Sequence, residues 1–311
     1  MRLLALPPLP KDLLEVLFGD PRLELVTPAE RTQAAVDVLL PEVDLVLGDW
    51  TPQLRVNDPG PRVVFVQQPS AGVDGIDVPA CTDRGVAVAN CAGANANSVA
   101  EWCLSASFAL LRKTVEADAA VRRGEWPQTS LGGRELAGLQ VGIVGMGAIG
   151  TATARLFTAL GCPTRYWSRS RHDAAPAPYA ELADLLATSD IVVLVIALGP
   201  ETRGLIDPRA LKKGALLVNG ARGEVVDEGG LIEALASGHL GGAATDVFAQ
   251  EPLPADSALR TAANLVLSPH MAGSTVEAAL RIVGQAKANL LRVLDGQPPR
   301  DVVNGLATLR S

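Results

Sequence analysis

Short apolar runs alternate with turns and helix-like stretches along the first part of the chain. Five of these runs have the length and continuous apolar character of buried strands: Leu3–Leu6, Leu23–Val26, Asp44–Leu47, Val63–Gln67 and Val86–Ala89. Such strands, separated by segments long enough to cross over, are typical of parallel sheets that helices cover on both faces. The pattern therefore predicts a parallel α/β domain in this part of the chain.

The same alternation resumes at Leu139 and continues to Leu267. It predicts strands at Val141–Val144, Thr164–Trp167, Ile191–Ile196, Ala215–Val218, Gly242–Asp246 and Asn264–Leu267. The helix-like stretches between them are Ala148–Leu160, Tyr179–Ala187 and Asp227–Ser237. Asp227 is a suitable N-cap for the last of these. We therefore expect a second α/β domain.

Two longer helices are predicted outside these alternations. Val99–Val121 has apolar residues at helical spacing, and Ser98 is a plausible cap at its start. Ser274–Leu294 is long enough to carry the chain back to the first domain. Each of these helices is therefore expected to connect the two domains.

Composition excludes several classes of protein. Of the 311 residues, 48% are hydrophobic and 20% charged, and the net charge is -7 without any lysine or arginine run, which argues against nucleic-acid binding. The apolar run Asp190–Gly199 is too short to span a membrane, and the segment Met1–Pro8 does not have the features of a signal peptide. We expect a cytoplasmic protein without disulfides or zinc, because no CxxC spacing occurs among Cys81, Cys91, Cys103 and Cys162.

A glycine motif follows the predicted strand Val141–Val144 and opens the next helix. It reads Gly145-Met146-Gly147-Ala148-Ile149-Gly150. In a dinucleotide-binding turn the first glycine permits the tight turn, the second lets the backbone approach a pyrophosphate, and the third lets helix and strand pack closely. The helix N-terminus, with Ala148 and Ile149, offers N–H groups to the phosphates. The alternative is a tight turn without a ligand.

The residues after the following strand bear on the type of cofactor. An NAD site usually has an acidic residue at this point, but here Ser168 is followed by Arg169 and Arg171. Serine does not repel a 2′-phosphate, and the two guanidinium groups can pair with one. We therefore predict that NADP(H) is preferred and that NAD(H) is possible. The alternative is that both arginines are merely solvated.

Three residues suited to acid–base chemistry follow three successive strands. Arg222, Glu251 and His270 all come after a strand and so are expected at the carboxyl edge of one sheet. A guanidinium can hold a carboxylate and polarise a carbonyl, an imidazolium can donate a proton, and a carboxylate can orient the imidazole. Reduction of a 2-keto acid by hydride needs these groups. His270 alone could equally be a structural loop residue.

These motifs together resemble the D-isomer-specific 2-hydroxyacid dehydrogenase family. The resemblance covers nearly the whole chain and is strongest from Ala94 to Ser274. Besides the glycine motif, it rests on Ser70–Asp74, Asn97–Glu101, Gly199–Leu205, Asn219–Glu228 and the segments around Glu251 and His270. It implies that Arg222, Glu251 and His270 are catalytic and that Arg222 and His270 contact the substrate. It also implies substrate binding by Ala71, Gly72 and Val73, and cofactor binding by Thr202, Ala221 and Asp246.

The resemblance also implies an architecture. We expect two Rossmann- or flavodoxin-like doubly wound parallel-sheet domains with an active-site cleft between them. Residues 1–97 and 285–311 would form the substrate-binding domain, and residues 98–284 the dinucleotide-binding domain. A homodimer through the dinucleotide-binding domain is expected, with the segment Arg122–Gly138, including Trp126, as an arm on the partner. The alternative for this segment is an ordinary interdomain loop.

Within the family, Trp167–Arg171 resembles the corresponding segment of NADPH-linked glyoxylate and hydroxypyruvate reductases. We therefore expect reduction of a small 2-keto acid to the D-2-hydroxy acid. Two alternatives stay open: an enzyme like phosphoglycerate dehydrogenase, and a nucleotide-sensing protein like the corepressors that share this fold.

Overall fold

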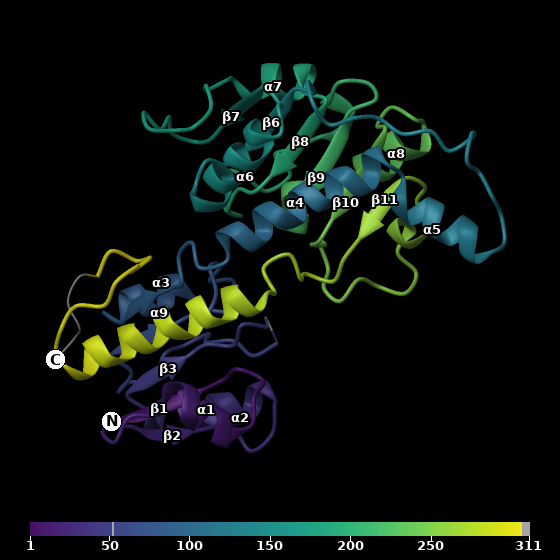
Figure 1. The fold of residues 1–311 in the computed structure, drawn as a ribbon. Helices are drawn as coiled ribbons and strands as arrows, with labels where there is room; N and C mark the ends of the chain where they lie inside the picture. The colour runs from purple at the N-terminus through teal and green to yellow at the C-terminus, as the bar shows by residue number, and fades with distance from the viewer. Residues whose placement is uncertain (52, 307–311) are drawn as a thin grey trace. The chain divides into compact units, whose positions relative to one another are not determined.

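The computed structural model describes residues 1–51 and 53–306, which form two compact units. One unit combines Met1–Asn95 with the chain from Val276 onward, and the other is Ala96–Thr275. The predicted domain boundaries at 97/98 and 284/285 lie two and nine residues from these junctions. The assignment of residues 96–97 and 276–284 to one domain or the other stays a prediction. Figure 1 labels the elements of both units.

The first unit is built on a five-stranded sheet in which every pairing is parallel, in the order β2-β1-β3-β4-β5. Its strands are β1 (Arg2–Ala5), β2 (Glu24–Val26), β3 (Leu45–Leu47), β4 (Phe65–Gln67) and β5 (Ala87–Ala89). Its helices are α1 (Lys11–Phe18), α2 (Gln33–Leu39), η1 (Leu40–Glu42), α3 (Val78–Asp83) and α9 (Val276–Leu294). Residues from α1 and α9 pack on one face of the sheet, and residues from α2 and α3 on the other.

The second unit is built on a six-stranded, wholly parallel sheet in the order β11-β10-β9-β8-β6-β7. Its strands are β6 (Val141–Val144), β7 (Thr164–Trp167), β8 (Ile191–Leu194), β9 (Leu216–Asn219), β10 (Gly242–Thr245) and β11 (Leu265–Leu267). Its helices are α4 (Ala96–Leu111), α5 (Thr114–Arg122), α6 (Ala148–Ala159), α7 (Leu182–Thr188) and α8 (Glu228–Ala236), with short 3₁₀ turns η2 (Pro208–Ala210), η3 (Gly223–Val225) and η4 (Ala258–Thr261). The predicted fold of two doubly wound parallel sheets is confirmed.

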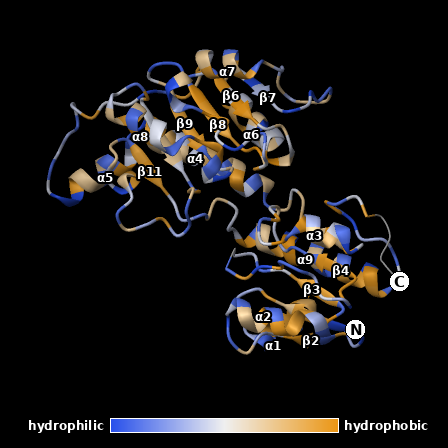
Figure 2. Cartoon of the chain, turned by 180° about the vertical axis from the view of Figure 1, so that it is seen from behind, coloured by the Kyte–Doolittle hydropathy of each residue, from blue (hydrophilic) through white to orange (hydrophobic). Residues whose placement is uncertain are grey.

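Alternate residues of each central strand contribute to different cores. In β8, Ile191 and Val193 pack with residues of α4 and α6, whereas Val192 and Leu194 pack with residues of α7 and α8. Successive side chains of a strand point to opposite faces, so a strand buried on both faces must be apolar throughout. Figure 2 shows this continuous apolar character in β6, β8 and β9.

The predicted single helix Val99–Val121 was wrong. The chain forms α4 and α5 instead, with a turn between them at Lys113, whose φ of 49° interrupts the helix. The break could not be foreseen, because no glycine or proline marks it and the helical spacing of apolar residues continues across it. The predicted cap was also wrong, because Ser98 lies inside α4, where its hydroxyl hydrogen-bonds the Thr275 hydroxyl at 2.8 Å.

Two further sequence features can be compared with the structure. Asp227 caps α8 as predicted, because its side chain accepts a hydrogen bond from the Gly230 N–H at 3.1 Å. Within residues 1–51 and 53–306, no helix combines the length and apolar character needed to cross a membrane. The same residues contain no group of three or more His, Cys, Asp or Glu side chains placed to hold a metal ion.

Candidate active site

The carboxyl ends of β8, β9, β10 and β11 are linked by hydrogen bonds that continue beyond the strands. The N–H groups of Gly220, Asp246 and His270 donate to the carbonyls of Leu194, Asn219 and Asp246, at 3.0, 3.1 and 2.7 Å. These bonds hold the loops after β9, β10 and β11 in register. The three predicted catalytic residues follow those same strands, so they lie along one edge of one sheet.

Asp246 fixes the loop that carries His270. Its buried carboxylate accepts hydrogen bonds from the Ser268 hydroxyl at 2.6 Å, the Met271 N–H at 2.8 Å and the Ala272 N–H at 2.7 Å. His270 itself has a φ of 54°, which is uncommon for a residue with a side chain. The Asp246 carboxylate thus binds the Ser268 side chain before the left-handed His270 and the backbone N–H groups of the two residues after it. Its predicted role in cofactor binding stays a prediction.

His270 and Glu251 form a directly bonded pair. The His270 Nδ1 lies 2.7 Å from the Glu251 Oε2, and the other carboxylate oxygen of Glu251 accepts from the Phe248 N–H at 3.0 Å. The His270 side chain is 42% exposed and that of Glu251 only 23%. The Nε2 atom of His270 has no hydrogen-bond partner in the described part of the chain. Glu251 therefore orients an imidazole whose second nitrogen is open to a ligand.

The pKa of Glu251 is lowered in this setting. Burial alone raises it, but the hydrogen bonds from His270 and from the Phe248 N–H, together with the charges of His270 and Arg222, lower it further than burial raises it. Glu251 consequently stays ionised to a lower pH than an ordinary glutamate does. The ionised carboxylate can therefore accept the hydrogen bond from the His270 ring and hold the ring in one orientation.

Arg222 lies in the loop that follows β9. The neighbouring Gly223 packs so closely on the backbone of Phe248 that an added Cβ would overlap it. This contact brings the Arg222 loop against the Glu251 loop. Arg222 donates from Nη1 to the Ala221 carbonyl at 2.6 Å, and the Ala221 N–H donates to the Asn219 side chain at 3.0 Å. The structure thus brings the guanidinium into the same loop cluster as the Glu251–His270 pair.

The glycine motif has the geometry of a phosphate cradle. Gly145 has a φ of 106°, and a Cβ there would lie 2.7 Å from the Val195 carbonyl oxygen. A Cβ on Gly150 would overlap the Gly145 carbonyl, whereas one on Gly147 would meet nothing within 4 Å. Helix α6 begins here without a side-chain cap. The close packing, the open space at Gly147 and the uncapped N–H groups fit the pyrophosphate of a dinucleotide.

The cradle also lies at the reversal of strand order. The chain passes from β6 to β7 on one side of the sheet and to β8 on the other side. Ligands of doubly wound sheets bind in the crevice that such a reversal creates at the carboxyl ends of the strands. The position of the glycine motif after β6 therefore agrees with its predicted function.

The loop after β7 differs from the sequence prediction in its contacts. The Ser168 hydroxyl donates to the Ser170 carbonyl at 2.5 Å. The exposed Arg169 side chain makes no ion pair or hydrogen bond with any described residue. Arg171, in contrast, pairs with Glu181 and lies over the ring of Tyr179. Only one of the two predicted phosphate-binding arginines is therefore free of a neighbouring carboxylate.

Two other predicted site residues have defined local contacts. The Thr202 hydroxyl donates to the Ala197 carbonyl and accepts from the Gly199 N–H, both at 2.8 Å, so it organises the loop after β8. In the first unit, Ala71, Gly72 and Val73 follow β4. Their carbonyls accept hydrogen bonds from Asn90, Ser70 and Ile76, at 2.7, 2.7 and 2.9 Å respectively. Their N–H groups donate to none of the described residues and could bind a carboxylate.

Sequence reasoning missed the partners that position these residues. Glu181 was assigned to a helix starting at Tyr179, but Tyr179 pairs with Tyr166 in a β-bridge and α7 begins at Leu182. An acidic and an aromatic residue two positions apart, close in sequence to Arg169 and Arg171, were the available signal that one of these arginines has protein partners. Ser268 was also missed, because its bond to Asp246 joins residues far apart in the sequence.

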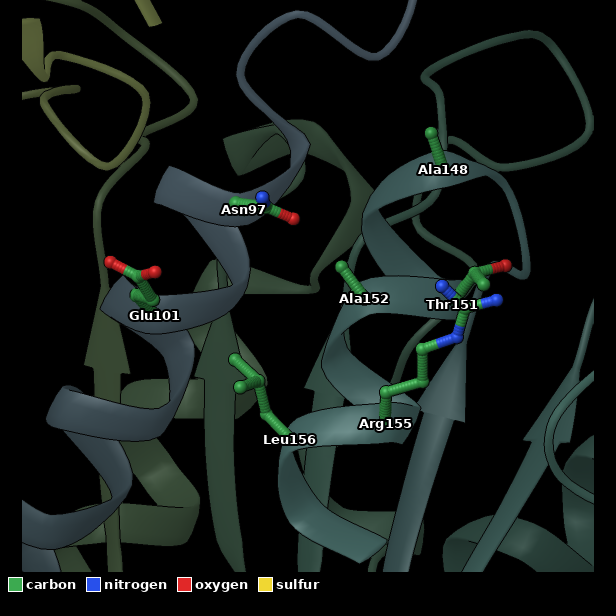
Figure 3. A pocket seen from close by; sticks show the side chains of 7 residues that line it. All are labelled: Asn97, Glu101, Ala148, Thr151, Ala152, Arg155 and Leu156. Atoms are coloured by element: carbon green, nitrogen blue, oxygen red, sulfur yellow. The ribbon is translucent and has the colours of Figure 1, made fainter. Parts of the chain in front are cut away.

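A groove of about 510 Å³ lies between α4 and α6 in the second unit. Asn97 and Glu101 line it from α4, and Ala148, Thr151, Ala152, Arg155 and Leu156 line it from α6. Figure 3 shows the Leu156 side chain directed toward α4. Of the predicted site residues, only Ala148 contributes to this groove. Glu101 and Arg155 are exposed and form no ion pair with any described residue.

Comparison with known proteins supports the assignment. Residues 104–272 match the family model for the NAD binding domain of D-isomer specific 2-hydroxyacid dehydrogenases. A glyoxylate reductase from Thermofilum pendens is 39% identical over 262 residues, which cover 80% of this chain and 77% of that protein. A D-3-phosphoglycerate dehydrogenase from Mycobacterium tuberculosis is 37% identical over 274 residues, covering 85% of this chain and 52% of that protein. The crystal structure of the TT0316 protein from Thermus thermophilus is 33% identical, with a TM-score of 0.86 over 97% of this chain and 100% of that one.

A dinucleotide cradle and an acid–base pair on one sheet edge define a nicotinamide-dependent oxidoreductase. The chain belongs to the D-isomer specific 2-hydroxyacid dehydrogenase family. The resemblance seen in the sequence, the enzyme class and the nicotinamide type of cofactor are thereby confirmed. The family also defines the substrate class as 2-hydroxy acids and the corresponding 2-keto acids.

Proposed function

We propose that this enzyme reduces a small 2-keto acid, such as glyoxylate or hydroxypyruvate, to the D-2-hydroxy acid with NADPH as the preferred reductant. The observation that carries the proposal is the Glu251–His270 pair, with an open Nε2 on His270 and Arg222 in the adjoining loop. The similarity to a glyoxylate reductase supports the substrate class.

Each side chain has a distinct task in this reaction. When bound, the nicotinamide supplies a hydride to the carbonyl carbon of the substrate. The open Nε2 of His270 donates a proton to the carbonyl oxygen as negative charge develops there, and Glu251 holds the ring in position through Nδ1. Arg222 binds the substrate carboxylate and polarises the carbonyl. In the first unit, the unused N–H groups of Ala71, Gly72 and Val73 are suited to bind a substrate carboxylate.

The proposed cofactor preference rests on the loop after β7. Ser168 carries no charge that would repel a 2′-phosphate, and its hydroxyl is held by the Ser170 carbonyl. Arg169 is exposed and unpaired among the described residues, so its guanidinium can bind a phosphate without first losing another partner. Gly145, Gly147 and the first turn of α6 would hold the pyrophosphate. Thr202, Ala221 and Asp246 complete the proposed cofactor site.

An oxidation screen tests the proposal directly. The purified protein is incubated with NADPH or NADH and with glyoxylate, hydroxypyruvate, pyruvate, phenylpyruvate or a branched-chain keto acid. We expect the highest kcat/KM for glyoxylate or hydroxypyruvate with NADPH, because Arg222 is suited to bind the carboxylate of a 2-keto acid and the cofactor loop has Ser168 and the exposed Arg169 where an acidic residue would repel a 2′-phosphate. Faster turnover with NADH would contradict the cofactor preference. In the reverse assay, with the oxidised cofactor, faster oxidation of 3-phosphoglycerate than of D-glycerate would favour the phosphoglycerate dehydrogenase alternative. Cofactor binding without turnover of any acid would favour a nucleotide sensor.

We further propose a homodimer formed through the second unit. Trp126, in the segment after α5, is 78% exposed, and Val115 and Val121 are also exposed. The groove between α4 and α6 offers unpaired opposite charges at Glu101 and Arg155 above a floor of small and apolar side chains. A two-fold axis places the same surface on both subunits, so Glu101 can meet Arg155 of the partner subunit twice in one interface. A second copy of this chain is therefore the proposed occupant.

Charge reversal at the groove tests this interface. Glu101→Arg and Arg155→Glu each place like charges opposite one another, and each is expected to raise the dimer dissociation constant, measured by analytical ultracentrifugation. The double variant restores opposite charges and should regain most of the lost affinity. Arg203→Glu, an exposed reversal on the same unit, is the matched control and should leave the assembly unchanged. Single variants that remain wild-type-like, or a double variant that stays monomeric, would argue against the proposed pairing.

A further inference from the structure

Arg171, Tyr179 and Glu181 form one cluster beside the cofactor loop. The Arg171 guanidinium carbon lies 4.3 Å from the centroid of the Tyr179 ring, and its Nη2 lies 3.3 Å from the Glu181 Oε1. The other oxygen of Glu181 accepts from the Tyr179 hydroxyl, also at 3.3 Å. The ring and the carboxylate therefore contact the same guanidinium from two directions.

The cluster is attached to the end of β7 through Tyr166. The Tyr179 ring meets the Tyr166 ring edge-on, with 5.5 Å between their centroids. The Tyr166 hydroxyl in turn accepts from the His172 N–H at 2.8 Å, one residue after Arg171. Tyr166 is almost fully buried. The backbone at Arg171 and the ring beneath its guanidinium are thus anchored independently of Glu181.

The carboxylate of Glu181 is consequently not needed to hold Arg171 in place. Both partners of the ion pair are largely exposed, with 70% and 66% of their side chains accessible. Ion pairs between such side chains contribute little to stability. The charge of Glu181 has a larger effect on phosphate binding than on stability, because a phosphate monoester itself carries between about 1.5 and 2 negative charges at neutral pH. A carboxylate within 3.3 Å of the binding cation repels that phosphate and competes for the same N–H donors.

We propose that Glu181 is a specificity-determining residue that limits the preference of this enzyme for NADPH over NADH. The inference rests on the proposed use of Arg169 and Arg171 for the 2′-phosphate. Arg169 binds the phosphate without competition, whereas Arg171 must exchange Glu181 for it. NADH has hydroxyl groups at this position, so its affinity is not reduced by the carboxylate in the same way. Glu181 therefore reduces the difference in affinity between NADPH and NADH.

The test measures binding of two cofactor fragments by isothermal titration calorimetry. 2′,5′-ADP carries the 2′-phosphate and 5′-AMP lacks it, so their ratio of dissociation constants isolates the phosphate contribution. Glu181→Gln should bind 2′,5′-ADP about 2- to 5-fold more tightly than the wild type, the range expected for losing one exposed ion-pair competitor, with 5′-AMP unchanged. Asp184→Asn removes an exposed negative charge from the first turn of α7, the helix that Glu181 precedes, and should leave the ratio unchanged.

The mechanism also predicts a dependence on Arg171. In the Arg171→Ala background, Glu181→Gln should no longer tighten 2′,5′-ADP binding, because the shared guanidinium is gone. Weaker or unchanged 2′,5′-ADP binding in Glu181→Gln, an equal change for 5′-AMP, or an equal effect of Asp184→Asn would each overturn the inference. A wild type that binds NADH more tightly than NADPH would overturn the proposed cofactor preference instead. The fragment ratio would still decide the role of Glu181.

Discussion

Replacing His270 with alanine is expected to lower kcat for keto-acid reduction by about 10²- to 10⁴-fold, the usual contribution of a positioned proton donor. The variant loses the Nε2, which has no hydrogen-bond partner among the described residues, and it also removes the partner of Glu251. The affinity for NADPH should change little, because the phosphate cradle lies after β6 and its geometry depends on Gly145, Gly147 and Gly150. Stopped-flow or steady-state oxidation of NADPH gives kcat, and calorimetry gives the dissociation constant.

The matched control for this variant is His239→Ala. His239 lies beyond the end of α8, where its Nε2 contacts the Leu211 carbonyl at 2.8 Å, and it belongs to no proposed site. We expect this control to retain wild-type kcat. Activity of His270→Ala within about threefold of the wild type would refute the role of His270 as proton donor. A parallel loss of cofactor affinity would indicate instead that the loop held by Asp246 has collapsed.

The second large effect is expected at Arg222. Arg222→Met removes the charge that we propose binds the substrate carboxylate, and kcat/KM should fall by about 10²- to 10³-fold, as when a preorganised donor to a developing charge is lost. Arg222→Lys retains the charge but lacks the forked geometry of a guanidinium, so a smaller loss is expected, mainly as a higher KM. Initial rates over a range of keto-acid concentrations separate the two constants.

Arg203→Lys serves as the control for the change of side chain. Arg203 is exposed, lies 3.7 Å from Glu224 and belongs to no proposed site, so its replacement should leave kcat/KM unchanged. If Arg222→Met kept a wild-type kcat/KM, a contact between Arg222 and the substrate carboxylate would be ruled out. If both lost only stability, with kcat/KM preserved at low temperature, Arg222 would have a structural role.

Much of the fold was predictable because the strands of a doubly covered parallel sheet are short, continuous apolar runs that can be recognised locally. A strand such as Ile191–Leu194 is buried on both faces, so all of its residues are apolar and the run is recognisable without its neighbours. The glycine motif was recognisable for a similar reason. At Gly145 and Gly150 an added Cβ would meet backbone atoms, so the identity of these residues is dictated locally.

The predictions that failed depended on contacts that sequence patterns do not contain. No glycine or proline lies at the break at Lys113, and the helical spacing of apolar residues continues through it. The contacts of Asp246 with Ser268 and of Arg171 with Glu181 were not foreseen, because the partners come from separate elements. The Glu251–His270 contact, in contrast, was expected from the position of both residues after strands of one sheet, and the two side chains lie 2.7 Å apart.

The division of the first unit between the two ends of the chain determines the order in which the protein can fold on the ribosome. The second unit, Ala96–Thr275, is synthesised as one uninterrupted segment and can complete its core before translation ends. The first sheet emerges earlier but lacks α9, whose Ala286, Leu290 and Val293 fill one of its two cores. One apolar face of that sheet therefore stays uncovered until α9 has been synthesised.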